Sequence, residues 1–358
     1  MRILVDIGHP AQVHYFKNTI WNLESSGHEI IITARNKDVT LRLLKAYNFN
    51  YKVVGSSTGN ILGKACNILR NDYILLKIAR KFKPDLFLSF CSPYAAHVSK
   101  LMHKVHIAFC DTESASLVIW LTLPFTDIVC TPLSFRRRLD GKKHIRFNGY
   151  FELAYLHPKY FKPDDSVLDY LNLSKNDKFT ILRFISWSAY HDVNLRGFKK
   201  GSEMNFIKNL EKYGQVFITS ERKLPKELEK YRLNIPPEKI HSLLQYANLY
   251  VGEGGTMAVE AAILGTPSIH VESTSSGIAT GEFSGNFLEL RDKYHLLYFY
   301  PDQNQALQKA IDILEDKNSK RTWRRKRERM LRDKIDVTAW MTDLIENFFE
   351  RVCIDNIK

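Results

Sequence analysis

Short apolar runs alternate along the chain with longer segments whose apolar residues recur at helical spacing. The first run is residues 3–7, and the segment after it places Phe16, Ile20 and Leu23 three or four positions apart. Such runs are typical of buried strands, and such spacing is typical of helices with one apolar face. The alternation continues to about residue 148 and starts again at residue 179. It predicts an α/β protein made of two doubly wound parallel sheets, each covered by helices.

The predicted elements divide the chain into two domains. Residues 149–176 are rich in Pro, Asp and Tyr and form the predicted connector. We predict an N-terminal domain at 1–160, a C-terminal domain at 161–335, and a last helix at 336–358 that packs back on the first domain. Strands are expected at 3–7, 29–33, 51–54, 84–90, 106–110, 127–131, 145–148, 179–184, 216–219, 240–241, 249–251 and 268–271.

One stretch, residues 251–270, carries the most specific local pattern. The apolar run that ends at Val251 breaks into Gly252-Glu253-Gly254-Gly255, and a helical pattern follows until Gly265 and Pro267 end it. Two adjacent glycines at a helix N-terminus let backbone N–H groups approach an anion closely. Glu260, about one turn into this helix, is placed to accept hydrogen bonds from sugar hydroxyls. The alternative is a tight packing turn with a solvated glutamate.

Composition indicates a globular protein with anionic partners. The 358 residues are 44% hydrophobic and 25% charged, and the formal net charge is +13. This charge suits nucleotide phosphates, nucleic acid or an acidic membrane surface without choosing among them. The basic stretch 317–334 is predicted to be a solvated helix with Trp323 and Met330 turned inward, and a phosphate or membrane surface is its alternative. Because no nucleic-acid fold motif accompanies it, we expect no specific nucleic-acid partner.

Cysteine usage and hydropathy favour a cytoplasmic protein. The five cysteines are scattered without a C-x-x-C pair, which gives no zinc or redox motif and fits a reducing compartment. The chain enters its first strand at once, so we expect no signal peptide. Residues 115–123 are apolar but too short to span a bilayer, which takes about 20 residues. A buried helix is predicted there, with a membrane-dipping helix as the alternative, and attachment to the inner face of the membrane stays open.

The chain resembles a glycosyltransferase-like family of unknown function. The matching residues are Asp6-Ile7-Gly8-His9-Pro10 with His14, the stretch 183–187 with His191-Asp192, and residues 218–221, 236–241 and 252–267. The last block is also similar to the nucleotide-sugar signature of MurG-type glycosyltransferases and of UDP-N-acetylglucosamine 2-epimerase. The resemblance runs nearly end to end and implies the GT-B architecture, in which two Rossmann-like domains face each other across a cleft.

The resemblance implies that the second domain binds a nucleotide-diphosphate sugar. Glu260 would hold the ribose hydroxyls, and Gly254, Gly255 and Thr256 would meet the diphosphate. Ile240, through its backbone, or His241 would flank the base. The remaining donor-site positions follow the first two strands of this domain, and they are Ser186, Trp187, Ser220 and Glu221.

The first domain would supply the acceptor side and the catalytic base. His9 or His14 is placed to take the acceptor proton, since a histidine pKa near 6.5 suits work at neutral pH. Asp111 would act as the base or orient a histidine. The alternatives are a loop-capping or structural role for each histidine and a helix N-cap role for Asp111. No Asp-x-Asp pair follows a strand, and Asp111-Thr112-Glu113 is the nearest approach to one. Since the resemblance to GT-B enzymes also implies a diphosphate held without a metal, we expect no metal and no cofactor besides the donor, for which a UDP-sugar is expected.

Three functions fit this sequence, and transfer of a sugar from a nucleotide-diphosphate sugar to an unknown acceptor is favoured. An anionic or lipid-linked molecule is one candidate for that acceptor. The epimerase pattern places an acid after the fourth strand, where this chain has Phe90-Cys91-Ser92-Pro93. Its His-Arg pair in the second domain is replaced by Ile185-Ser186-Trp187-Ser188. Both departures count against an epimerase. A nucleotide-sugar-binding protein without catalysis is the third alternative.

Overall fold

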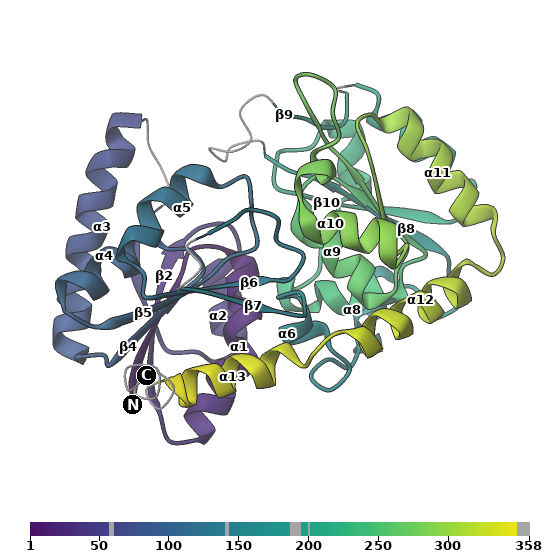
Figure 1. Cartoon of the computed structure of the whole chain (residues 1–358). Coiled ribbons are helices and arrows are strands. Elements are labelled where there is room, and N and C mark those ends of the chain that lie inside the picture. The colour runs from purple at the N-terminus through teal and green to yellow at the C-terminus, as the bar shows by residue number, and fades with distance from the viewer. Residues whose placement is uncertain (57–60, 140–142, 187–194, 200, 349–358) are drawn as a thin grey trace. The chain divides into compact units, whose positions relative to one another are not determined.

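The chain forms two compact units, each built on a parallel sheet (Figure 1). The computed structural model describes residues 1–56, 61–139, 143–186, 195–199 and 201–348, with the backbone alone at residue 56 and at 61–67. Unit 1 comprises residues 1–160 and 335–358, and unit 2 comprises residues 161–334. The α/β class and the two doubly wound sheets agree with the sequence prediction.

Unit 1 carries a seven-stranded sheet in the order β3-β2-β1-β4-β5-β6-β7. Each neighbouring pair is parallel, so the carboxyl ends of these strands share one edge. The order reverses between β1 and β4, and ligands of open α/β sheets gather at such a switch point. The strands are β1 Arg2–Ile7, β2 Glu29–Asn36, β3 Tyr51–Ser56, β4 Leu86–Ser89, β5 Val105–Phe109, β6 Ile128–Pro132 and β7 His144–Phe147.

Helices cover this sheet and bring in the end of the chain. Helix α13 packs on α1 and α6, where Thr338 Oγ1 donates to the carbonyl of Ala154 at 2.6 Å and Trp340 stacks on Phe147. The C-terminal helix thus completes the core of unit 1. The helices of this unit are α1 Pro10–Ser25, α2 Thr40–Ala46, α3 Ile61–Phe82, α4 Pro93–Leu101, α5 Ser116–Thr122, the 3-10 turn η1 Leu123–Phe125, α6 Leu153–Leu156 and α13 Val337–Glu346.

Unit 2 carries a five-stranded parallel sheet in the order β10-β8-β11-β12-β14. Its strands are β8 Phe179–Phe184, β10 Gln215–Ser220, β11 Leu249–Gly252, β12 Ser268–Val271 and β14 Leu297–Tyr300, beside a small antiparallel pair of β9 Leu195–Arg196 and β13 Ser273–Thr274. Its α-helices are α7 Glu203–Leu210, α8 Ile240–Tyr246, α9 Gly255–Leu264, α10 Gly285–Leu288, α11 Gln303–Glu315 and α12 Ser319–Asp333. Shorter turns are η2 Asp165–Val167, η3 Asp169–Leu171, η5 Lys226–Tyr231, η6 Pro237–Lys239, η7 Thr280–Phe283 and the π-turn η8 Glu289–Lys293.

The structure corrects one predicted strand and confirms one predicted helix. Residues 240–241 begin helix α8 instead of forming a strand. The cause is the preceding Pro236-Pro237 pair, because proline suits the first turn of a helix and Pro237 opens the 3-10 turn that leads into α8. The basic stretch forms α12, in which Trp323 and Met330 are buried as predicted.

The prediction of a buried helix at residues 115–123 is wrong. The helix forms as α5, but Leu117, Val118 and Trp120 are exposed. Only the opposite face, with Ile119 and Thr122, is buried. Across the described ranges, no helix combines the length and the apolarity that crossing a membrane requires.

Candidate functional site

In unit 2, a glycine turn joins β11 to α9 at the carboxyl edge of the sheet. Gly254 has φ 78° and ψ 132°, a conformation that residues with a Cβ rarely adopt. A Cβ at Gly252 would lie 2.6 Å from Tyr250 Oη, and one at Gly254 would lie 3.0 Å from Ile185 Cγ2. Both positions therefore require glycine. Helix α9 starts at Gly255, so its first N–H groups lie at this edge, with the half-buried Thr256 next along the helix.

Arg183 and Glu221 form an ion pair at the ends of the neighbouring strands β8 and β10. Ser186 donates to Glu221 Oε2 through its backbone N–H at 3.3 Å and its hydroxyl at 3.4 Å. The Nε atom of Arg183 lies 4.0 Å from the position that a Cβ of Gly254 would take. The structure therefore places a cation beside the glycine turn and brings together the predicted residues Ser186, Glu221 and Gly254.

Arg183 was absent from the candidate residues that sequence reasoning selected. The signal was present, because Arg183 is the one charged residue of the otherwise apolar or neutral strand FTILRF. A charge in a strand of a covered parallel sheet needs a partner or a ligand. The pattern could not show that Glu221, 38 positions away, is that partner.

Glu253 bonds two backbone N–H groups that lie 13 positions apart, those of Ile185 and Phe198. It is fully buried, and its carboxylate accepts the backbone N–H of Ile185 at 2.9 Å and that of Phe198 at 2.8 Å. Burial raises the pKa of Glu253 to about 7, although these two bonds favour the ionised form. Glu253 thereby ties the segment after β8 to the glycine turn.

A second carboxylate lies at the glycine turn itself. Glu272, which follows β12, accepts the N–H of Gly254 at 3.4 Å and lies 3.9 Å from Nε2 of His270. The His270 ring also contacts Thr280 Oγ1 at 3.1 Å, and burial lowers the pKa of His270. A phosphate bound at this turn would meet the negative charge of Glu272, and Arg183 together with the α9 N-terminus would offset it.

Glu260 and His241 are bonded to each other in the interior of unit 2. His241 Nε2 and Glu260 Oε1 are 2.9 Å apart, and the two residues are 3% and 5% exposed. They join helices α8 and α9, while Ile240 is the half-buried first residue of α8. The structure thus pairs two predicted donor residues with each other and leaves little of either at the surface.

Of the remaining predicted donor residues, only Ser220 lies in the described part of the chain. The hydroxyl of Ser220 donates to the carbonyl of Arg222 at 2.8 Å, which shapes the turn after β10. Trp187 lies outside the described residues, as do His191 and Asp192 of the matching motif.

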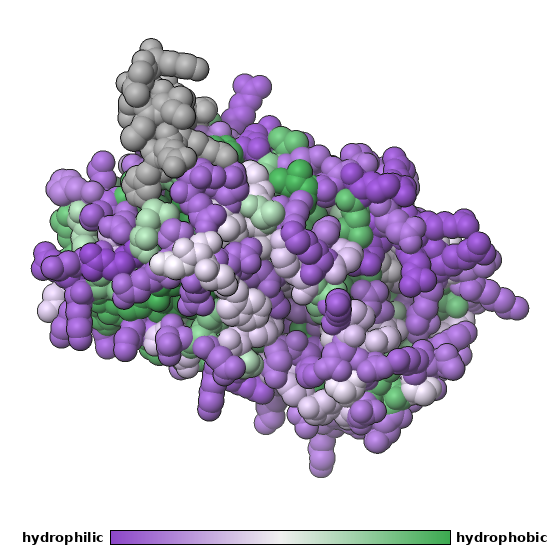
Figure 2. Space-filling model, turned by 90° about the horizontal axis from the view of Figure 1, so that it is seen from below, coloured by the Kyte–Doolittle hydropathy of each residue, from purple (hydrophilic) through white to green (hydrophobic). Residues whose placement is uncertain are grey.

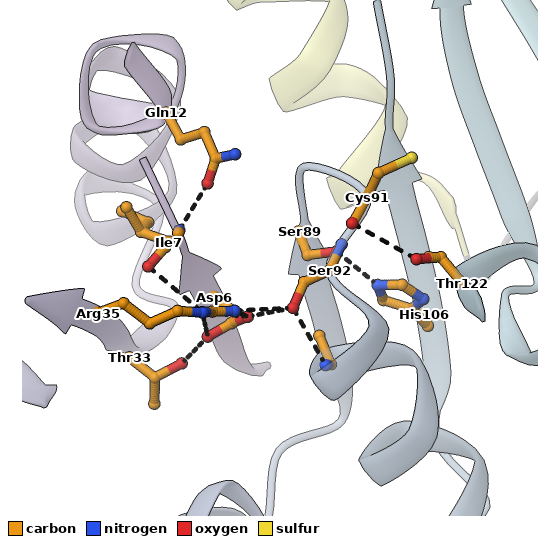
Figure 3. A network of polar contacts seen from close by, with 12 residues as sticks. Asp6, Ile7, Gln12, Thr33, Arg35, Ser89, Cys91, Ser92, His106 and Thr122 are labelled. Atoms are coloured by element: carbon orange, nitrogen blue, oxygen red, sulfur yellow. Dashed lines mark hydrogen bonds and ion pairs between the residues drawn. The ribbon is translucent and has the colours of Figure 1, made fainter. Parts of the chain in front are cut away.

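In unit 1, a buried ionic network lies at the switch point of the sheet (Figure 3). Asp6 at the end of β1 is fully buried and pairs with Arg35 of β2, Nη2 to Oδ2 at 2.5 Å. Thr33 Oγ1 donates to Asp6 Oδ1 at 2.8 Å, and the Ser92 hydroxyl donates to Oδ2 at 2.5 Å. Arg35 Nη2 also donates to Ser92 Oγ at 2.9 Å. The network joins β1, β2 and the N-terminus of α4 directly beneath Gly8.

His9 caps helix α1 as its N-cap residue. Its Nδ1 accepts the backbone N–H of Ala11 at 3.2 Å, and Pro10 follows at the first helical position. An Nδ1 that accepts a hydrogen bond leaves the proton of the neutral ring on Nε2. In this tautomer Nε2 is a hydrogen-bond donor, so His9 has to change tautomer before Nε2 accepts a proton.

His14 and Asp111 lie in different surroundings. His14 is 4% exposed, stacks on Tyr155 at 5.2 Å and contacts Tyr47 Oη through Nδ1 at 3.2 Å. This aromatic environment favours a structural role for His14.

Asp111 is partly buried after β5, at the same edge as His9, and accepts the Thr112 hydroxyl at 2.9 Å. Burial raises the pKa of Asp111 to about 6. Because one strand separates β1 from β5, the two edge positions are roughly 10 Å apart.

Within the part of the chain that the structure describes, no three His, Cys, Asp or Glu side chains come together as a metal site requires. The positive charge at the glycine turn comes from Arg183 and the helix N-terminus.

Solved structures with a similar fold include a UDP-GlcNAc 2-epimerase and glycosyltransferases. The UDP-GlcNAc 2-epimerase of Methanocaldococcus jannaschii, determined with UDP-GlcNAc and UDP, is 14% identical with a TM-score of 0.64, covering 92% of this chain and 99% of that one. The glycosyltransferase SsfS6 of Streptomyces sp. SF2575 is 15% identical with a TM-score of 0.60, covering 97% and 99%, and has also been determined with thymidine diphosphate. At these identities the likeness shows the fold, which is the predicted GT-B fold.

Sequence comparison identifies the family. An uncharacterized protein of Methanocaldococcus jannaschii is 26% identical over 279 residues, covering 75% of this chain and 80% of that protein. The profile of the family described as "Protein of unknown function (DUF354)" matches residues 1–348, nearly the whole chain. The resemblance seen in the sequence is confirmed, and the chain belongs to the DUF354 family.

Proposed function

We propose that the protein is a glycosyltransferase that transfers a sugar from a nucleotide-diphosphate sugar to an acceptor hydroxyl. The observation that carries the proposal is the glycine turn before α9 with Arg183 beside it, in a GT-B fold whose solved relatives include enzymes determined with UDP-GlcNAc, UDP and thymidine diphosphate. Backbone N–H groups at a helix N-terminus and an arginine fork both suit a diphosphate.

Unit 2 binds the donor in this proposal. Gly254, Gly255 and Thr256 contact the diphosphate through their backbone, and Arg183 leaves Glu221 to neutralise it. The buried Glu260–His241 pair supports the ribose and base side, and a UDP-sugar is the proposed donor. Arg183 and the α9 N-terminus stabilise the negative charge that grows on the diphosphate as its bond to the anomeric carbon breaks. No metal takes part in this step as proposed.

Unit 1 supplies the base, for which we propose Asp111. The acceptor oxygen attacks the anomeric carbon, its proton passes to the carboxylate, and the nucleoside diphosphate leaves. A pKa of about 6 leaves this carboxylate ionised yet more basic than an exposed one at neutral pH. His9, with its proton on Nε2, donates a hydrogen bond instead. The net charge of +13 supports an anionic or lipid-linked acceptor.

The donor assignment is tested by nucleotide binding and turnover. Arg183→Gln should weaken UDP binding about tenfold to a hundredfold, since a hydrogen bond to a charged group contributes about 1.5–3 kcal/mol. Arg232→Gln is the matched control, because Arg232 also pairs with one glutamate in unit 2. Calorimetric titration with UDP and dTDP measures the affinity. Equal affinity of the Arg183 variant and the control would remove Arg183 from the site.

The reaction class is tested with a panel of nucleotide sugars. Release of nucleoside diphosphate with transfer to an added acceptor supports the proposal. A free sugar altered at carbon 2 points to an epimerase instead, and binding without turnover points to a binding protein.

Asp111→Asn should abolish transfer while UDP affinity stays unchanged. His9→Ser, which retains a capping oxygen, should reduce transfer less than Asp111→Asn does.

A further inference from the structure

Helix α5 of unit 1 is apolar on the face that it turns toward solvent. Leu117, Val118 and Trp120 are 46%, 38% and 67% exposed, and Phe125 in the following turn is 39% exposed. Leu117, Val118 and Trp120 fall on one side of the α-helix, which has 3.6 residues per turn. The opposite side carries Ile119, which packs in a core cluster with Cys91, Cys110, Val129 and Phe135. The helix therefore already has its core partners, and a second apolar face stays uncovered.

This uncovered face is unusual for a surface helix. A helix on a globular protein carries polar residues on its outer side, and contiguous exposed apolar patches mark interaction sites. Residues 115–125 contain no charged side chain at all. On the face of the molecule seen in Figure 2, hydrophilic residues prevail and hydrophobic patches lie between them.

Cations border the apolar face. A cavity of about 420 Å³ lies beside Trp120 and Leu123, and its lining includes Arg137, Arg138 and Lys143. Arg137 Nη1 donates to Ser116 Oγ at 2.9 Å, which fixes this guanidinium at the start of α5. Lys143 Nζ donates to the carbonyl of Thr126 at 3.1 Å, just after the turn that follows α5.

Among the described residues, the acidic groups beside this face are engaged, and one of them, Asp72, contacts His97 at 2.9 Å where that ring packs on Phe125. Glu113 accepts the backbone N–H of Arg136 at 3.2 Å, and Asp127 accepts that of His106 at 2.9 Å. Arg136, Arg137 and Arg138 follow one another in the sequence, and Arg136 and Arg138 are exposed. The border of the apolar face is therefore positively charged.

We propose that this surface, which we call the α5 surface, attaches the protein to the surface of an anionic phospholipid bilayer. Leu117, Val118 and Trp120 enter the boundary between headgroups and acyl chains. Arg137, Arg138 and Lys143 contact lipid phosphates. An apolar helix face with tryptophan and a basic border is the pattern of proteins that lie on a membrane without crossing it. The proposal stands independently of the proposed transfer reaction.

Charge complementarity selects the bilayer as the occupant. Each Lys or Arg near an anionic leaflet strengthens binding about fivefold, and the whole chain adds a net charge of +13 that draws it to such a surface. A second copy of this chain would bring the same cations to the same contact, which opposes self-association through this surface.

Vesicle flotation of the full chain tests the proposal. We expect binding to vesicles of phosphatidylcholine with phosphatidylglycerol at about 0.1 M salt, and little binding to phosphatidylcholine alone. Salt near 1 M should release most of the protein, because the screening length falls from about 10 Å to about 3 Å. Equal binding to both vesicle types would overturn the electrostatic part, and no binding to either would overturn the proposal.

Matched variants locate the contact. Leu117→Ser and Trp120→Ser should each weaken vesicle binding about tenfold or more, because each removes a large apolar side chain from the bilayer. Ile278→Ser in unit 2 is the control, since Ile278 is 47% exposed and Leu117 is 46% exposed. Arg138→Gln should weaken binding about fivefold. Equal effects of the α5 variants and the control would overturn the assignment.

Fluorescence gives a readout that folding defects do not imitate. Brominated phospholipids should quench tryptophan emission in the intact chain, and Trp120→Phe should remove most of this quenching while vesicle binding persists. Unchanged quenching in Trp120→Phe would place another part of the protein in the bilayer. Concentration-dependent dimers that dissociate in Leu117→Ser, with no vesicle binding by the intact chain, would assign the α5 surface to a second copy instead.

Discussion

Replacing Arg35 with methionine should destabilise unit 1 strongly. Asp6 is fully buried, and Arg35 supplies the one positive charge that the structure records against its carboxylate in the described chain. Methionine keeps most of the side-chain volume but leaves a buried carboxylate without a counter-charge. Breaking a buried ion pair in this way costs about 3–5 kcal/mol. The hydroxyls of Thr33 and Ser92 still donate to Asp6, which favours the lower half of this range.

Combining Asp6→Asn with Arg35→Met distinguishes the contribution of the ion pair to stability from the contribution of side-chain packing. Asp6→Asn alone leaves Arg35, which is 8% exposed, without its carboxylate and should cost about 3 kcal/mol, the lower end of the same range, because asparagine keeps one acceptor oxygen. Asp6→Asn combined with Arg35→Met removes both charges and should cost less than the sum of the two single changes by at least about 1.5 kcal/mol. Equilibrium urea unfolding, followed by fluorescence and circular dichroism, measures the three free energies.

The control is an exposed pair in the same unit. Lys159 bonds Asp336 at 2.9 Å, but the Lys159 side chain is 60% exposed, so Lys159→Met should leave the free energy of unfolding almost unchanged. Additive effects of Asp6→Asn and Arg35→Met would refute the reasoning, because they would mean that the two charges do not stabilise each other. A loss in Lys159→Met as large as in Arg35→Met would refute the role assigned to burial.

Two further predictions concern the glycine turn of unit 2. Gly254→Ala should destabilise the protein by about 1–3 kcal/mol and weaken UDP binding, because the turn needs φ 78° and the methyl group would meet Ile185 at 3.0 Å. Gly277→Ala, with φ 80° and open space, should leave UDP affinity unchanged, and equal losses of affinity would contradict the assignment. Glu253, with its pKa raised to about 7, stabilises the fold fully below pH 4.5, and this contribution is lost as the pH rises through 7. The stability of Glu253→Gln relative to the natural chain should therefore increase by about 3 kcal/mol between pH 4.5 and 8 in urea titrations, whereas a constant difference would contradict the raised pKa.

The fold and the glycine turn were predictable because their signals are local. Alternating strand and helix patterns define two parallel sheets without any knowledge of contacts, and the structure has both. The requirement for glycine at position 254 was likewise readable from two adjacent glycines before a helix pattern. Residues 240–241 were misread as a strand edge, although the Pro236-Pro237 pair before them signals the start of a helix.

The ionic partners at the two sheet edges were not predictable, because pairing across strands has no local signal. Arg35 lies 29 positions from Asp6, and Arg183 lies 38 positions from Glu221. In each case the side chains meet only because parallel strands place their carboxyl ends at one edge. The same limit applies to the Glu260–His241 pair, since an exposed glutamate and a buried one have the same local sequence. A charged residue near a strand end can be marked as a candidate from the sequence, but its partner depends on strand order.

Helix α5 shows how an apolar segment can be predicted correctly as a helix and wrongly as buried. A run of apolar residues predicts low exposure only if the fold offers a partner for every side of the helix. Here the core accepts Ile119, while Leu117 and Trp120 find no partner among the described residues of unit 1. Fully burying a large apolar side chain contributes about 1.5–3 kcal/mol. Leu117 and Trp120 are still 46% and 67% exposed, so covering the face would recover part of that free energy. The error in the burial prediction therefore points to the same surface that we propose binds an anionic bilayer.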